Sequence, residues 1–259
     1  MQTDSIQPIE NDRIQPLVAY RAIRAIFKDK EDTGQVFKLV NALKGKSMAI
    51  SMARFRNDPV GKQIISENRK LLDTLNNTAY LRSLPEGSFG RVYQQFLETE
   101  GLSAEGLVQA RMEAPEWGSQ ERENALFSAR LRDAHDLTHV LTGYGRNPLG
   151  ELSVLAFTQA QTRNRGIGVL IFFGMFKFKK ELPRSIPIFR SAWEARRNSK
   201  RAAWLPAADW EALLKLPLEE VRRKLNIAHP TIYKSAEPRM VQIEAEFQRK
   251  RAEMTPQAA

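Results

Sequence analysis

Apolar residues recur at spacings of three and four along most of the chain, a pattern that predicts amphipathic helices. Strand-like alternation is nearly absent, and most glycines and prolines fall between the periodic segments. The pattern therefore predicts an all-α fold, built as a single mostly helical domain. The predicted helices cover residues 17–27, 36–43, 62–76, 91–98, 104–112, 119–142, 151–163, 188–203, 208–215, 218–225 and 240–254.

The densest apolar segment is residues 167–176, IGVLIFFGMF, and Lys177, Lys179 and Lys180 follow it directly. Ten residues are too few to span a bilayer, which takes about 20. Two interpretations stay open. The segment is either a helix packed in the core, or a helix that lies in the headgroup region of a membrane, where apolar residues, Trp193 and positive charge belong together.

The composition limits the chemistry. The chain has 259 residues, three histidines and no cysteine, with 40 Lys+Arg against 30 Asp+Glu and a net charge of +10. Without cysteine there is no disulfide, no thiol nucleophile, and no cysteine-ligated zinc or iron–sulfur cluster. A transition metal in this protein must be held by His, Asp and Glu side chains.

The positive charge is concentrated in one segment. Residues 163–201 hold eleven Lys/Arg and two Asp/Glu, whereas the remainder holds 29 basic and 28 acidic residues. Because this basic segment also carries the apolar run, an anionic membrane surface is favoured over nucleic acid, for which no recognised motif is present. The first residues are polar and acidic, unlike a secretory or transit signal, so we expect a cytoplasmic protein.

Two of the three histidines lie four residues apart, in RDAHDLTHV. On a helix His135 and His139 project from one face and can share an ion, whereas Asp136 lies about 100° round from His135. A glycine-rich turn, GYGRNPLG, then leads to Glu151 at the start of a predicted antiparallel helix. His135, His139 and Glu151 therefore form a candidate site for one divalent metal.

Alternative readings of these residues stay open. The histidines also fit a solvated polar stripe, and Glu151 fits a helix N-terminus that favours negative charge. A zincin motif would need glutamate where Asp136 stands, and no nucleotide-binding glycine loop is present. In the turn, Arg146 and Asn147 are candidate contacts for a substrate carboxylate through the arginine fork, or residues that only stabilise the turn.

The motif His-Asp-x-x-His, eleven residues and then Glu resembles the signature of the metal-binding coenzyme Q (ubiquinone) biosynthesis protein family. Two further segments are similar to that family, LPEGSFGRVYQQFL at residues 84–97 and WLPAADWEALLKLPLEEVRRKLNI at residues 204–227. The resemblance covers roughly residues 15–230. Three motifs in the same order make the resemblance specific.

The resemblance implies a site and a reaction. It implies that His135, Asp136, His139 and Glu151 bind a divalent cation, usually taken to be zinc, with iron, manganese or cobalt as alternatives. The family's reaction replaces the carboxyl at ring carbon 1 of a polyprenylated 4-hydroxybenzoate-type precursor by hydroxyl, with His135, His139 and Glu151 as the catalytic set. The alternative is a non-catalytic scaffold that binds the prenylated intermediate and organises the other ubiquinone-biosynthesis enzymes.

The resemblance also implies an architecture and a location. It implies an all-helical fold with an apolar lipid tunnel, a homodimer, and a bacterial relative that is peripheral on the cytoplasmic face of the inner membrane. Residues 15–235 are expected to form the metal- and prenyl-lipid-binding helical domain. Residues 236–259 are expected to form a charged C-terminal helix and a loose tail.

Overall fold

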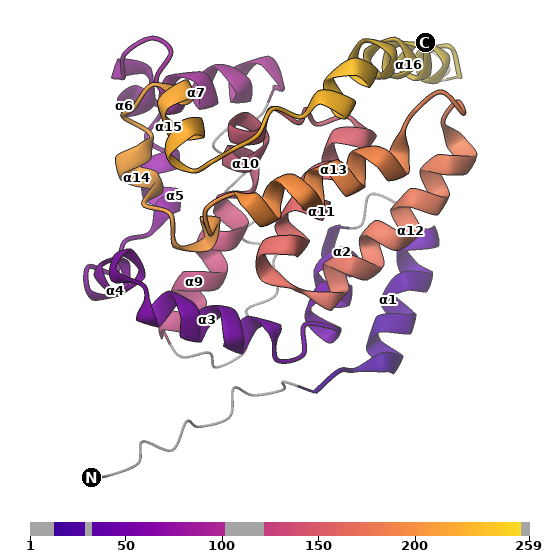
Figure 1. The fold of residues 1–259 in the computed structure, drawn as a ribbon. Coiled ribbons are helices and arrows are strands. Elements are labelled where there is room, and N and C mark those ends of the chain that lie inside the picture. Colours follow the sequence, from indigo (N-terminus) through magenta and orange to yellow (C-terminus); the bar gives the residue numbers. More distant parts are fainter. Residues whose placement is uncertain (1–12, 29–32, 102–121, 255–259) are drawn as a thin grey trace, which may run out of the picture.

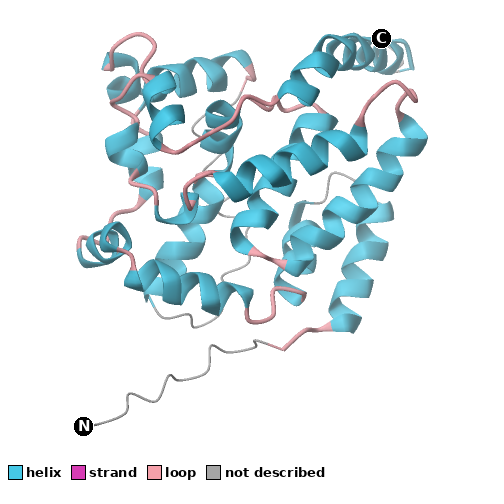
Figure 2. Cartoon of the chain, in the orientation of Figure 1, coloured by secondary structure: helices cyan, strands magenta, loops and turns pink. Residues whose placement is uncertain are grey.

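Helices, and no strand, form the regular secondary structure of the computed structural model, which describes residues 13–28, 33–101 and 122–254 (Figure 2). The predicted all-α fold is confirmed for these residues. The helix predicted at residues 104–112 lies outside them. In the described part of the chain, no helix is both long and apolar enough to cross a membrane.

The helices are numbered in chain order, as labelled in Figure 1. Their bounds are α1 Pro16–Lys28, α2 Thr33–Ala42, α3 Ser47–Asn57, α4 Pro59–Ser66, α5 Leu71–Leu75, α6 Thr78–Ser83, α7 Phe89–Thr99, α9 Arg122–Asp133, α10 His135–Thr142, α11 Pro148–Thr162, α12 Arg165–Glu181, α13 Ile188–Arg201, the 3-10 helix η1 Leu205–Ala207, α14 Trp210–Leu213, α15 Leu218–Lys224 and α16 Thr231–Met254.

Helix α11 runs through the middle of the molecule, and α13 packs along it (Figure 1). Small residues at the interface let the two helices approach closely. The hydroxyls of Ser153 and Ser191, one from each helix, lie 2.9 Å apart there. Helix α11 also contacts α3, α10, α12 and α16. Its position means that each end of α11 meets a different group of helices.

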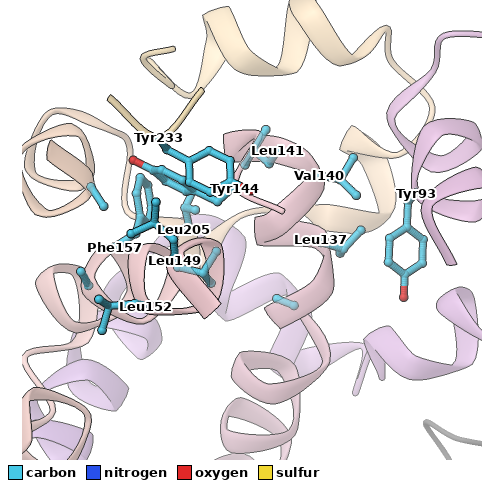
Figure 3. Packing of buried hydrophobic residues seen from close by; sticks show 14 of the residues in the cluster. Tyr93, Leu137, Val140, Leu141, Tyr144, Leu149, Leu152, Phe157, Leu205 and Tyr233 are labelled. Atoms are coloured by element: carbon cyan, nitrogen blue, oxygen red, sulfur yellow. The ribbon is translucent and has the colours of Figure 1, made fainter. Parts of the chain in front are cut away.

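The main core lies between α7, α10, α11 and the first turns of α16. Figure 3 shows Leu137 and Leu141 from α10 beside Leu149 from α11, and all three side chains are fully buried. The rings of Tyr144 and Tyr233 meet edge to face with their centroids 5.3 Å apart. Burial of this apolar surface fixes α10 against α11, the two helices that carry the predicted metal ligands.

The single helix predicted for residues 62–76 is wrong, because the chain forms α4 and α5 with a break between them. Asn68 takes a left-handed conformation with φ of 50°, which ends α4. The amide of Arg69 donates back to the carbonyl of Ile64 at 3.0 Å, as in a Schellman closure. Asparagine tolerates this conformation better than most residues, which gives the physical reason for the break.

The long helix predicted for residues 119–142 is also interrupted. Helix α9 ends at Asp133 and α10 starts at His135, with Ala134 at ψ of 0° between them. The carbonyl of Ala134 accepts both the amide of Thr138 at 3.0 Å and its hydroxyl at 2.8 Å. A threonine hydroxyl bonded back to this carbonyl bends a helix, so the interruption is local.

The apolar run becomes helix α12, and the core-helix interpretation is wrong for its outer face. Phe172, Phe173 and Phe176 are 38% to 52% exposed, and of the whole helix only Gly166 is classed as buried. Phe176 meets Phe189 of α13 with ring centroids 6.1 Å apart. On α13, Trp193 is also exposed and lies under the guanidinium of Arg197. We call Phe172, Phe173, Phe176, Phe189 and Trp193 the aromatic face.

The C-terminal helix α16 begins at Thr231, nine residues before its predicted start. The carboxylate of Glu194, itself buried, accepts from the amide of Ile232 at 3.0 Å and so caps the first turn of α16. Helix α16 crosses residue 235. The division of the chain there and the apolar lipid tunnel both stay predictions.

Candidate metal centre

The two histidines of the motif occupy one short helix. His135 is the first residue of α10 and His139 lies one turn later. Their Nε2 atoms are 3.3 Å apart, and the rings meet edge to face with centroids separated by 4.9 Å. The predicted arrangement of two imidazoles on one helical face is confirmed.

Glu151 reaches both rings from the first turn of α11. Its Oε2 atom lies 3.4 Å from Nε2 of His135 and 3.4 Å from Nε2 of His139. The turn after α10 therefore brings the three predicted side chains together, as the sequence analysis expected. A carboxylate oxygen and two imidazole nitrogens converge on a single small volume.

Asp136 lies closer to this group than its helical position suggested. Ligand atoms of His135, Asp136 and His139 all lie within 4.8 Å of one another. His135 and Asp136 are the first two residues of α10. Asp136 therefore stands with the two histidines as part of a potential metal-binding group.

The turn between the helices is held by its own residues. Gly143 ends α10 with φ of 77°, a left-handed conformation that favours glycine. The side chain of Asn147 accepts from the amide of Gly150 at 3.0 Å and caps α11, and its amide group donates to the hydroxyl of Tyr233 at 2.8 Å. A Cβ on Gly150 would lie 1.9 Å from the carbonyl oxygen of Gly145, so only glycine fits there.

A backbone carbonyl orients His139. Nδ1 of His139 lies 3.0 Å from the carbonyl oxygen of Tyr144, and a carbonyl can only accept. Nδ1 therefore carries the proton in the neutral ring, and Nε2 presents its lone pair toward His135 and Glu151. Phe96 of α7 stacks on the same ring with an interplanar angle of 20°. His139 is fully buried, whereas the side chain of His135 is 39% exposed.

Electrostatics keep Glu151 ionised. Burial acts to raise the pKa of Glu151, but its hydrogen bonds with His135 and His139 outweigh burial and lower that pKa to about 2. Burial acts to lower the pKa of His135, yet the hydrogen bond and the charge of Glu151 raise it above its ordinary value. At neutral pH Glu151 is therefore a carboxylate, the form that binds a cation.

Arg146 lies at the edge of the same site. Its Nε is 3.8 Å from Oε1 of Glu151, and its Nη1 is 4.0 Å from Glu100. Nε is buried and has no hydrogen-bond partner among the described residues. A buried guanidinium nitrogen without a partner is costly, so this position suits an incoming anion.

The donor set fits a divalent transition metal. Two imidazole nitrogens and a carboxylate oxygen, with a second carboxylate close by, are ligands for zinc, iron, manganese or cobalt. The carbonyl of Tyr144 behind His139 supplies the outer support that metal-bound histidines usually have. Orphaned Nε of Arg146 places an anion contact next to these ligands.

Sequence reasoning missed several side chains that build the site. The buried hydroxyl of Tyr93 has no hydrogen-bond partner among the described residues, and burial together with the charges of Asp136 and Asp133 raises the pKa of Tyr93. Arg222 donates to the carbonyls of Leu141 at 2.9 Å and of Val140 at 3.0 Å at the end of α10. Tyr93 lies in the family segment at residues 84–97, and Arg222 lies in the one at residues 204–227. Their membership in these two outer segments was the only sign in the sequence that they belong near the site.

Those outer segments pack on each other beside α10. The amide of Phe89 donates to the carbonyl of Leu216 at 2.8 Å, and the amide of Gly90 donates to the carbonyl of Leu214 at 2.9 Å. Helices α7 and α15 both contact α10. The three motifs that are separate in the sequence therefore surround a single site.

Comparisons with known proteins agree with this arrangement. A family model described as coenzyme Q (ubiquinone) biosynthesis protein Coq4 matches residues 8–231. The mitochondrial ubiquinone biosynthesis protein COQ4 homologue of Bos taurus is 30% identical over 190 residues, which cover 72% of this chain and 68% of the bovine protein. The mitochondrial coq4 protein of Aspergillus terreus is 31% identical over 174 residues, which cover 67% of this chain and 58% of the fungal protein.

A solved structure is similar in fold. A protein of Nostoc punctiforme, assigned by name to ubiquinone biosynthesis, superposes with a TM-score of 0.62 and 22% sequence identity, and covers 85% of this chain and 99% of its own. At this identity the likeness shows the fold alone. The family model and the bovine relative carry the assignment: the chain belongs to the Coq4 family of coenzyme Q (ubiquinone) biosynthesis proteins.

Proposed function

We propose that this protein carries out a metal-dependent oxidative decarboxylation in ubiquinone biosynthesis, in which the ring carboxyl of a polyprenylated 4-hydroxybenzoate-type precursor is replaced by hydroxyl. The observation that carries the proposal is the convergence of His135, His139 and Glu151, with Nε2 and Oε2 atoms 3.3 to 3.4 Å apart. Beside them, Nε of Arg146 is 3.8 Å from Glu151 and has no hydrogen-bond partner among the described residues. Membership of the Coq4 family supports a role in ubiquinone biosynthesis. The arrangement of the candidate ligands supports the metal-dependent part of the proposal.

His135, His139 and Glu151 would hold the metal, with Asp136 as a further ligand. When bound, a divalent metal supplies Lewis acidity toward the carboxylate or the phenolic oxygen of the substrate. The guanidinium of Arg146 binds the substrate carboxylate and orients the ring toward the histidines. The exchange breaks the bond between the ring and the carboxyl group and releases that group as CO₂, while a new bond forms between the ring carbon and the oxygen of a water molecule. The two electrons and two protons that are lost pass to dioxygen, the external oxidant that we assign, which leaves as hydrogen peroxide.

The prenyl chain needs an apolar path to this site. A small cavity of about 60 Å³ beside His135 is lined by Leu131, Phe157, Leu205 and Trp210 among others. It is smaller than one prenyl unit, so side chains must move before a lipid enters. We propose that this cavity marks the inner end of the predicted lipid tunnel.

The aromatic face supports delivery of the substrate from a membrane. Exposed aromatic residues beside many lysines and arginines bind well at an anionic headgroup region. We therefore propose peripheral association with the cytoplasmic face of a bacterial inner membrane. A homodimer and contacts with other ubiquinone-biosynthesis enzymes complete this proposal.

The metal part of the proposal is tested by elemental analysis of purified variants. We expect His135→Ala and Glu151→Ala to lose the bound divalent metal. The matched control is His229→Ala, since His229 is exposed in the loop before α16 and lies outside the motif. Wild-type metal content in both site variants would contradict the metal centre.

The decarboxylase and the scaffold are separated by turnover. Purified protein incubated with a short-chain prenylated 4-hydroxybenzoate and dioxygen should release CO₂ and form the hydroxylated ring, as detected by mass spectrometry. Binding of the compound by the metal-loaded protein without any product would favour the non-catalytic scaffold.

A further inference from the structure

A second, larger cavity lies far from the metal centre and has a strongly basic wall. Its volume is about 970 Å³, and it lies between the turn before α3, the C-terminal end of α11 and the end of α13. Among the described residues that line it there is no aspartate or glutamate. The six lysines and arginines in its wall are Lys44, Lys46, Arg54, Arg163, Arg165 and Lys200.

This cavity does not include the candidate metal ligands, although Gln161 and Thr162 line both it and the small cavity beside His135. Glu151 stands in the first turn of α11, whereas Gln161 and Thr162, which line the cavity, stand in its last turn. At about 1.5 Å of rise per residue, Glu151 and Thr162 are roughly 16 Å apart along α11. Neither the predicted ligands nor Arg146 is part of the cavity wall.

Backbone features place positive charge at the cavity. Arg163 ends α11 with φ of 56° and ψ of 23°, a left-handed conformation usually given to glycine or asparagine. Helix α3 starts at this cavity after Lys46 without a side chain that caps its first amides, so its first turn contributes partial positive charge. The C-terminal ends of α11 and α13 contribute partial negative charge, and the full charges of the lysines and arginines exceed it.

The wall is held in place by contacts that leave its cations facing the cavity. The guanidinium of Arg54 lies over the ring of Trp204, 4.2 Å from its centroid. Nε1 of Trp204 donates to the carbonyl of Gln161 at 3.2 Å, and Nε2 of Gln161 donates to the carbonyl of Ser199 at 2.9 Å. These bonds tie α11 to the end of α13, so the wall is organised before any ligand binds.

Apart from Lys44, five cations line the cavity and repel one another, and a multiply charged anion would reduce that cost. We propose that this cavity binds a phosphoryl anion, either a soluble pyrophosphate group or the headgroup of an anionic phospholipid. Backbone amides at a helix start, lysines and the planar fork of arginine are the groups that recognise phosphoryl oxygens. The volume is within the range of small-molecule sites, about 300 to 1,000 Å³.

The test compares two double variants of the full-length protein. Arg163→Gln with Lys200→Gln removes two charges from the wall, and Lys62→Gln with Lys215→Gln removes two exposed charges elsewhere. Pyrophosphate binding is measured by calorimetry, and headgroup binding is measured by cosedimentation with vesicles of phosphatidylglycerol or of phosphatidylcholine. We call Arg163→Gln with Lys200→Gln the wall variant and Lys62→Gln with Lys215→Gln the control variant. Whichever of the two probes wild type binds, we expect the wall variant to bind it about tenfold more weakly and the control variant to bind it like wild type.

The two probes identify the source of the anion. Tight calorimetric binding of pyrophosphate that the wall variant loses supports a soluble ligand. Binding only to phosphatidylglycerol vesicles, lost in the wall variant, supports a lipid headgroup. A double variant of the aromatic face, Phe172→Ser with Phe176→Ser, should keep pyrophosphate binding. No binding of either probe, or equal loss in the wall and control variants, would overturn the proposal.

Stability gives an independent readout. Without ligand at low salt, the wall variant should melt at the same temperature as wild type or higher, because repulsion between like charges is reduced. At a concentration near its wild-type Kd, the probe should raise the melting temperature of wild type and of the control variant clearly more than that of the wall variant. A wall variant that melts lower and still gains stability from the probe would show that Arg163 and Lys200 serve packing instead.

Discussion

At the residue scale, the types and spacing of the candidate metal ligands could be predicted, but the contacts that support their side chains could not. His135, His139 and Glu151 follow from helical geometry and from one short turn. The contact of His139 with the carbonyl of Tyr144 has no side-chain signature, because every residue carries a carbonyl. Asp136 lies closer to the two histidines than an offset of about 100° around the helix suggests, because their ligand atoms all lie within 4.8 Å of one another.

Arg146 should matter for the substrate and not for the metal. We expect Arg146→Gln to keep its metal and to bind 4-hydroxybenzoate about tenfold more weakly, because the orphaned Nε and its fork are lost. Calorimetry of the metal-loaded protein measures the affinity, with the exposed Arg184→Gln as control. An unchanged affinity for the carboxylate would remove Arg146 from the proposed site.

Buried tyrosines should make the protein sensitive to alkali. Burial raises the pKa of Tyr233 to about 12, and burial also raises the pKa values of Tyr93 and Tyr144 above the ordinary value. The protonated Tyr233 therefore contributes free energy of unfolding that is fully present below pH 10 and is lost as the pH rises through 12. The loss is up to about 1.4 kcal/mol for each pH unit of that window. Denaturation of Tyr233→Phe at increasing pH should show a shallower loss than wild type, and an equal slope would contradict this assignment.

At the element scale, the sequence located most helices but not their interruptions. Periodicity over residues 62–76 and 119–142 ignores single residues, and Asn68 and Ala134 break those segments through local backbone bonds. Turn residues were more informative. The turn with Asn147 and Pro148 predicted the start of α11 near Glu151, and the structure places α11 at Pro148 with Asn147 as its cap.

The cap of α11 should couple folding to metal binding. We expect Asn147→Ala to lower the free energy of unfolding by about 1–2 kcal/mol, because it loses the bonds to Gly150 and Tyr233. Metal affinity should fall about tenfold as Glu151 loses its support.

The matched control for that variant is Asn164→Ala, which removes the equivalent cap from α12. It should destabilise the fold by a similar amount while leaving metal affinity unchanged. Metal affinity is measured by competition with a chelator. Equal affinity in the two alanine variants would show that the cap of α11 does not support metal binding.

At the scale of the whole molecule, the fold class could be predicted and the arrangement could not. Helical periodicity is local, whereas α7, α10 and α15 meet through contacts between residues far apart in the chain, such as Arg222 with Leu141. Only the family resemblance hinted that these segments belong together. The large basic cavity is likewise formed by three segments that are distant in the chain. The basic segment at residues 163–201 supplies Arg163, Arg165 and Lys200, but the lysines and Arg54 near α3 join them only in the folded structure.

The aromatic face should determine membrane binding. Replacing Phe172 and Phe176 by serine should reduce cosedimentation with phosphatidylglycerol vesicles about tenfold, because two exposed rings no longer enter the headgroup region. The control replaces Val241 and Phe247 of α16, which are also exposed but lie near glutamates. Equal binding by both double variants would show that charge alone holds the protein at the surface.

Helix α11 has Asn147 before its first turn and Arg163 after its last, so the metal centre and the basic cavity share one helical register. Inserting one residue within α11 would rotate one end by about 100° against the other and lengthen it by about 1.5 Å. Either Glu151 or Arg163 would then leave its position. If both sites serve the protein, natural variation should preserve the length of α11, 15 residues, even where its partly exposed side chains change.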